Sequence, residues 1–182
     1  TGLAVRLGIG SVRGIGSELA REIATHRPYA SIEELVARVP ALSRKQVEAL
    51  ATSGAFTESF GDDRRHALWE AGAYGHGNID KLQGIMGLQT RPTLPGMEPI
   101  EEAIADLWAT GISPDGHPTI FLREQLQAKG VITADQLPAV PHRDRAMVAG
   151  IVTHRQRPMS AKGATFISLE DETGLINVVC SK

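Results

Sequence analysis

The stretch Arg13-Gly14-Ile15-Gly16-Ser17 decides the fold of the amino-terminal part of the chain. Two glycines flank one apolar residue, and because glycine reaches positive φ at no steric cost, the stretch predicts a tight turn between two helices. Apolar residues recur at helical spacing on both sides of this turn: Ile9, Val12, Leu19, Ala20, Ile23 and Ala24. Free backbone N–H groups at the start of the second helix suit a phosphate. The pattern is typical of a helix-hairpin-helix.

Glycine-rich turns between helices also occur as ordinary caps, so one Gly-Ile-Gly turn is often purely structural. A second, weaker copy favours the functional interpretation. Ser31 with Glu34 predicts a helix that runs to Pro40, and Ser43 with Gln46 predicts another that ends at Gly54. The second turn lacks glycines. We therefore expect a tandem helix-hairpin-helix unit whose second hairpin is structural.

The composition limits how this chain can bind nucleic acid. Its 182 residues are 42% apolar and 22% charged, which is typical of a folded chain with one or two domains. The formal net charge is −2 and the pI is about 6.3. These values argue against binding by bulk positive charge. Any DNA contact is expected to be local and to depend on geometry.

The sequence gives little support for a disulfide, a metal site or a membrane segment. The single cysteine, Cys180, cannot form an internal disulfide, and its apolar neighbours predict a small core residue. The six histidines have no second ligand at metal-binding spacing, so no metal or other cofactor is expected in this chain. No membrane-spanning run and no signal-peptide pattern occur, which predicts a cytoplasmic protein.

Changes in composition divide the chain into four predicted segments. The hairpins and a following helix occupy residues 1–72, and the Gly/Pro-rich residues 73–98 form a linker. Residues 99–141 form a helical connector, in which Pro99 begins an amphipathic helix and Gly111 ends it. Residues 142–182 change to a strand pattern.

The strand pattern predicts a three-stranded meander. Its strands are expected over residues 145–155, 165–169 and 175–180, with a turn at 171–174. A meander with a basic first loop is typical of the start of an OB-fold, whose strands and loops commonly bind single-stranded nucleic acid. The candidate binding residues in this segment are Arg155, Arg157, Lys162 and Phe166, the last as a stacking aromatic.

A complete OB-fold has five strands, whereas only three are predicted here. The barrel is completed by a partner, left open or truncated, and we expect truncation. Open edges favour strand exchange and hence a dimer. A few basic residues in a loop are also common on an ordinary solvated surface. The predicted fold class is α+β, with a tandem helix-hairpin-helix domain, a helical connector and a partial OB-fold.

Several segments, taken in order, resemble the carboxy-terminal part of bacterial C-family (DnaE-type) replicative polymerases. They read VRLGIGSVRGIG (residues 5–16), TGISPDGHP (110–118), VAGIV (148–152) and FISLED (166–171). Two further segments, THRQRP (153–158) and ATF (164–166), are closer to the error-prone, damage-inducible ImuC branch.

This resemblance implies a part in translesion synthesis and damage-induced mutagenesis by a DNA-directed DNA polymerase. In the family, the catalytic carboxylates and their Mg ions lie upstream of such a segment, so no residue here is expected to catalyse synthesis. The hairpins are implied to lie on duplex primer-template DNA, through Arg13, Gly14, Ile15, Gly16 and Ser17. The implied partners are an ImuB-type adaptor and, through it, the sliding clamp.

Two other classes remain open. One is the DNA-binding module of a ligase or a Holliday-junction protein. Both place the OB-fold before the hairpins, and the ligase adds a four-cysteine zinc site that one cysteine cannot build. The other is a pure protein-interaction module of the mutasome, in which neither part contacts DNA, and the balanced charge is compatible with it.

Overall fold

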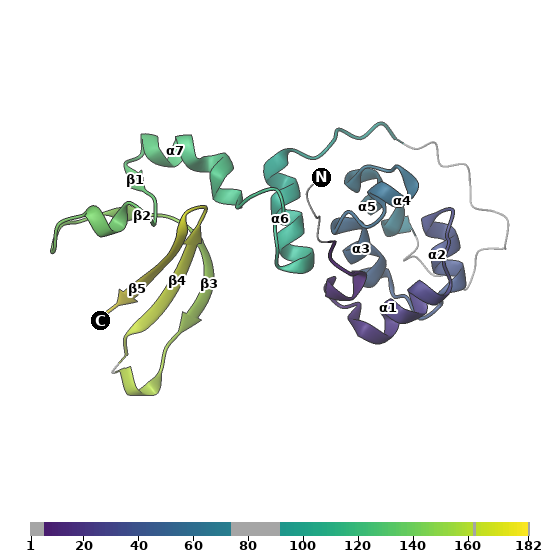
Figure 1. Cartoon of the computed structure of the whole chain (residues 1–182), viewed down its shortest axis with the longest axis horizontal. Helices are drawn as coiled ribbons and strands as arrows, with labels where there is room; N and C mark the ends of the chain where they lie inside the picture. The colour runs from purple at the N-terminus through teal and green to yellow at the C-terminus, as the bar shows by residue number, and fades with distance from the viewer. Residues whose placement is uncertain (1–5, 74–91, 162, 182) are drawn as a thin grey trace. The chain divides into compact units, whose positions relative to one another are not determined.

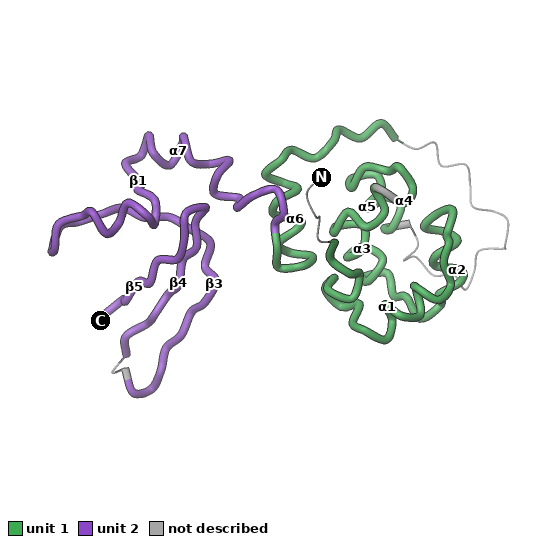
Figure 2. Tube along the Cα trace, viewed as in Figure 1, with its two compact units in different colours: residues 1–112 green, residues 113–182 purple. Residues whose placement is uncertain are grey.

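The computed structural model describes residues 6–73, 92–161 and 163–181 (Figure 1). The chain forms two compact units, residues 1–112 and residues 113–182 (Figure 2). Helices dominate the first unit and the second contains a sheet, which confirms the α+β class. Among the described helices, none is both long and apolar enough to cross a membrane.

Unit 1 contains both predicted hairpins. Its elements are η1 (Ile9–Ser11), α1 (Gly16–Thr25), α2 (Ile32–Arg38), α3 (Arg44–Thr52), α4 (Thr57–Phe60), α5 (Arg64–Ala73) and α6 (Pro99–Thr110). The first hairpin joins η1 to α1, and its first arm is a single 3-10 turn rather than a full helix. The second hairpin joins α2 to α3.

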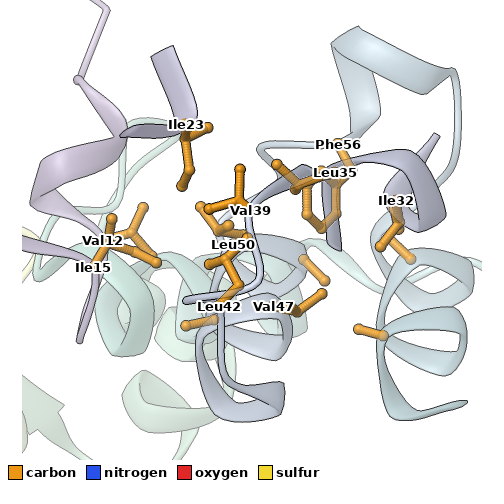
Figure 3. Packing of buried hydrophobic residues seen from close by; sticks show 14 residues of the cluster. Val12, Ile15, Ile23, Ile32, Leu35, Val39, Leu42, Val47, Leu50 and Phe56 are labelled. Carbon is orange, nitrogen blue, oxygen red and sulfur yellow. The ribbon is translucent and has the colours of Figure 1, made fainter. Parts of the chain in front are cut away.

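One apolar cluster holds the two hairpins together. Figure 3 shows Val12 and Ile15 of the first hairpin turned toward the cluster that contains Val39 and Leu50 of the second. Val39 and Ile32 are fully buried. Burial of each such side chain contributes about 1.5–3 kcal/mol to folding. The hairpins therefore fold as one unit and not as two independent motifs.

Side-chain caps begin the helices of the second hairpin as the sequence predicts. Ser31 Oγ accepts a hydrogen bond from the Glu34 N–H, and Glu34 Oε2 accepts one from the Ala30 N–H. At the start of α3, the Ser43 N–H donates to Gln46 Oε1 at 2.8 Å. These reciprocal bonds satisfy donors that a helix start leaves without partners.

Helix α6 belongs to unit 1, whereas the sequence assigns it to a connector over residues 99–141. Arg64 of α5 and Asp106 of α6 form an ion pair of 2.7 Å, with their side chains only 16% and 7% exposed. Arg65 and Glu101 form a second pair between the same helices. Charge pairs between distant segments have no periodicity, so the sequence pattern does not reveal this packing.

The described residues of unit 2 form one short α-helix, three 3-10 turns and two small sheets. Its elements are η2 (Pro118–Leu122), α7 (Arg123–Ala128), β1 (Val131–Ile132), η3 (Leu137–Ala139), β2 (Met147–Val148), β3 (Ile151–Gln156), η4 (Met159–Ala161), β4 (Thr165–Asp171) and β5 (Gly174–Cys180). Strands β3, β4 and β5 form the predicted antiparallel meander, and β1 pairs with β2 in parallel.

The strand predicted over residues 145–155 is two strands. β2 pairs with β1, and β3 pairs with β4 after a break at Ala149 and Gly150. A Cβ atom at Gly150 would lie 2.6 Å from the carbonyl oxygen of Glu170. Only glycine allows this close approach, which alternation of apolar residues does not reveal.

Buried polar groups anchor the turn between β4 and β5. Asp171 is 3% exposed, and its carboxylate accepts hydrogen bonds from the backbone N–H groups of Ala134, Thr173 and Gly174. Glu172 Oε2 accepts from Arg123 Nη2 at 2.8 Å and from Thr119 Oγ1 at 2.6 Å. The turn is thereby fixed to η2, to α7 and to the segment after β1.

Some sequence-based expectations differ from the structure or lie outside the described residues. The sequence predicts Cys180 in the core, but its side chain is exposed. Its neighbour Val179, which points to the opposite face of the sheet, is exposed as well, so neither face is covered at this end of β5. Most of the linker over residues 73–98 lies outside the described residues.

Candidate nucleic-acid interface

The candidate site is the loop between η1 and α1, and its two glycines have the backbone conformation that the sequence predicts. Gly14 and Gly16 have φ values of +80° and +67°, in the left-handed region that side chains disfavour. Between them, Ile15 is 4% exposed and packs into the core. The packing of Ile15 into the core fixes the loop, and both glycines remain exposed at the surface.

Several backbone N–H groups of the loop have no partner among the residues that the structure describes. The Ile15 N–H donates to the Val12 carbonyl at 3.0 Å, and the Arg13 N–H donates to the Ala109 carbonyl at 2.7 Å. Across the described ranges of the chain, the N–H groups of Gly14, Gly16 and Ser17 have no intramolecular acceptor. They lie at the start of the ten-residue helix α1. The loop therefore presents hydrogen-bond donors at the positive end of a helix dipole.

Arg13 is anchored inside unit 1 as well as exposed to solvent. Its Nε donates to the Trp108 carbonyl at 2.9 Å, and its guanidinium lies 5.0 Å from the centre of the Trp108 ring. The Trp108 carbonyl, near the end of α6, thus holds this side chain. The family resemblance implies that Arg13 binds DNA, and part of its donor capacity is already used within the protein.

The second hairpin touches this loop directly. Gln46 of α3 donates from Nε2 to the Gly14 carbonyl at 2.7 Å. Its Oε1 accepts from both the N–H and the hydroxyl of Ser43 at 2.8 Å. The expected structural hairpin therefore also contributes to the candidate site. The cap signal at Ser43 identifies Gln46 as a helix-start residue, but no local pattern reveals its contact with Gly14.

The charges beside the two hairpin loops are mixed. Arg44 forms an ion pair with Glu48 at 2.6 Å within α3. Lys45 is exposed, and within the described part of the chain it has no ion-pair partner. The sequence analysis did not select Lys45. Glu18, in the first turn of α1, is exposed and acidic. The loop surface therefore has little net positive charge, and its main-chain donors are its most distinctive feature.

The predicted nucleic-acid residues of the meander do not share one face. Phe166 pairs with Gln156, whereas Arg155 pairs with Ile167. Because successive residues of a strand point to opposite faces, Phe166 and Arg155 lie on opposite sides of the sheet. Both are exposed, as is Arg157 after β3. Lys162 lies outside the described residues.

Unit 1 has the geometry of a tandem helix-hairpin-helix unit, and this geometry defines the class of protein. In agreement, residues 1–67 match the family model for the helix-hairpin-helix motif. Within the described ranges, no cluster of three His, Cys, Asp or Glu side chains has a geometry that suits a metal ion.

Proteins of similar sequence relate the chain to a more specific group. It is 52% identical to an error-prone DNA polymerase of Mycobacterium tuberculosis over 99% of its own length, and 49% identical to that of Nocardia farcinica. The corresponding protein of Corynebacterium diphtheriae is 45% identical. The chain spans 17% of the length of these relatives. It is therefore related to one segment of the error-prone DNA polymerases, which confirms the resemblance to the C-family.

Proposed function

We propose that this chain is a non-catalytic part of an error-prone DNA polymerase and that it binds the backbone of duplex DNA without sequence preference. The observation that carries the proposal is the set of N–H groups at the exposed residues Gly14, Gly16 and Ser17, which have no acceptor within the described residues. Phosphate oxygens are the acceptors that such groups bind best at a helix start.

The same observation supports the absence of sequence preference. Contacts from main-chain donors to phosphates position a protein on DNA and carry no base information. Lys45 and the outer nitrogens of Arg13 lie on the same hairpin unit and supply the cationic contribution. With a net charge of −2, the chain contributes few phosphate contacts. We therefore expect weak binding with a shallow dependence on salt.

The wider role follows from the relatives and belongs to the proposal. We infer that the full-length protein is a DNA-directed DNA polymerase of translesion synthesis and damage-induced mutagenesis. Its two-metal chemistry, with Mg ions, would take place outside this segment. An ImuB-type adaptor, and through it the sliding clamp, would be its protein partners. A strand-exchanged dimer through the edges of the meander is a further proposal.

A second candidate is a protein-docking module that makes no contact with DNA. The specific observation in its favour is the balanced charge of the loop surface, including Glu18 in the first turn of α1. In that case, the N–H groups of the loop would bind carbonyl or carboxylate groups of a protein partner.

Fluorescence anisotropy with the full 182-residue chain separates the two functions. The probes are a labelled primer-template and a duplex of unrelated sequence, each titrated at several salt concentrations. Gly16→Val tests the loop, because a β-branched residue at a φ of +67° is strained. Gly8→Val is the matched control, since Gly8 has a φ of −71° and a Cβ atom there would have no neighbour within 4 Å.

We expect both duplexes to bind equally. Gly16→Val should raise the Kd about tenfold, which corresponds to about 1.4 kcal/mol, and Gly8→Val should leave it unchanged. Equal binding by the two variants, or no binding by the parent chain at low salt, favours the docking module.

A further inference from the structure

We propose that Gln46 is a positioning residue, which holds the Gly14–Ile15 peptide group so that the neighbouring N–H groups face outward. This inference rests on the proposed function, because it assigns a role in presenting the donors that bind DNA. Gln46 comes from the second hairpin, so the inference also gives that hairpin a part in the site.

Three hydrogen bonds fix the orientation of the Gln46 side-chain amide. Its Oε1 accepts from the Ser43 N–H and hydroxyl, each at 2.8 Å, and its Nε2 donates to the Gly14 carbonyl at 2.7 Å. A flipped amide would bring its NH2 group against the Ser43 N–H and its oxygen against the Gly14 carbonyl. Only one orientation of the Gln46 amide therefore satisfies both the Ser43 donors and the Gly14 carbonyl.

Gln46 binds the carbonyl of a peptide group whose N–H is also hydrogen-bonded within the protein. The carbonyl of Gly14 and the N–H of Ile15 belong to the same planar peptide unit. Gln46 binds the carbonyl, and the Val12 carbonyl accepts the N–H at 3.0 Å. With both ends fixed, the plane of this unit cannot rotate freely. The adjacent N–H groups of Gly14 and Gly16 are then directed to solvent.

Glycine makes this restraint necessary. Gly14 contributes the carbonyl of this peptide unit and Gly16 follows Ile15, and both glycines can leave their φ values of +80° and +67° at little cost. A loop that rotates freely would lose entropy on binding a phosphate, whereas a fixed loop has lost it already. Because its carbonyl oxygen and one N–H are already bonded within the protein, Gln46 itself is not assigned as a phosphate ligand.

Two substitutions at Gln46 separate its two roles. Gln46→Glu keeps an acceptor for Ser43 and removes the donor to Gly14, while Gln46→Met removes both without adding charge. The matched control is Gln125→Met, at an exposed position of α7. Amide hydrogen exchange of the full chain, followed by NMR without DNA, reports on the loop itself. We expect the Ile15 amide to exchange about fivefold faster in both Gln46 variants, as for loss of one hydrogen bond.

Anisotropy with the labelled primer-template tests the consequence for binding. Gln46→Met should raise the Kd about fivefold, and the salt dependence should keep its slope because no charge or phosphate contact is removed. The control variant should match the parent chain in both measurements.

The outcomes distinguish this inference from the proposed function. Unchanged exchange at Ile15 in Gln46→Met overturns the positioning role whether or not DNA binds. Faster exchange with an unchanged Kd, while Gly16→Val still weakens binding, also overturns it and leaves the proposed function in place. If Gly16→Val has no effect on binding, the proposed function fails, and the positioning role for DNA fails with it.

Discussion

Replacing Glu172 by Gln should destabilise unit 2 at neutral pH and have little effect in acid. The carboxylate lies between Arg123 and Thr119, and its side chain is 13% exposed. The hydrogen bonds from Arg123, with help from Thr119 and against the cost of burial, lower the pKa of Glu172 from 4.5 to about 2. The same contacts fix the turn between β4 and β5.

The pKa determines the size and the pH range of this effect. A carboxylate whose pKa is lowered in the folded state stabilises that state fully above its unfolded value of 4.5. The stabilisation is lost as the pH falls from there through about 2. A depression of this size corresponds to about 3 kcal/mol. Loss of one partner from a mostly buried ion pair has a similar cost, roughly 3 kcal/mol.

Urea unfolding followed by NMR measures this contribution. The backbone N–H resonances of Thr173 and Gly174 report directly on the anchored turn, since both donate to Asp171. The control is Glu124→Gln, at an exposed position of α7. We expect Glu172→Gln to lower the free energy of unfolding by about 3 kcal/mol at pH 7, with the difference from the parent chain disappearing toward pH 2. A difference that is equally large at both pH values would refute the reasoning.

Three other predictions concern packing and charge. Gly150→Ala places a Cβ atom 2.6 Å from the Glu170 carbonyl oxygen, so the free energy of unfolding of unit 2 should fall by about 2 kcal/mol in urea titrations. Asp106→Asn leaves the mostly buried Arg64 without its charge partner and should cost roughly 3 kcal/mol, measured by tryptophan fluorescence during unfolding. Arg13→Gln should reduce the salt slope of duplex binding by about one unit if Arg13 neutralises a phosphate, and an unchanged slope assigns it to the protein interior alone.

Local sequence patterns predict the hairpins well because their signals are local. The caps at Ser31 and Ser43, the glycines of the first loop and the helical spacing of apolar residues all act within one or two turns of helix. The meander is predictable for the same reason, since alternation and the turn at residues 171–174 are short-range features.

Features that depend on distant parts of the chain could not be predicted in this way. The contact of Gln46 with Gly14 spans 32 positions, and that of Arg13 with Trp108 spans 95. The pairing of α6 with α5 has no local pattern. The break at Gly150 depends on the backbone of another strand. Each of these features is a specific polar or steric contact, which hydrophobic periodicity does not encode.

The most direct test of the central claim is an NMR titration of the ¹⁵N-labelled chain with an unlabelled primer-template duplex. If main-chain donors of the first hairpin bind the DNA backbone, the N–H resonances of Gly14, Gly16 and Ser17 should shift earliest and most. The Ile15 resonance should shift less, because its N–H is already bonded to Val12. Shifts confined to unit 2, with the loop resonances unmoved at saturation, would contradict the account.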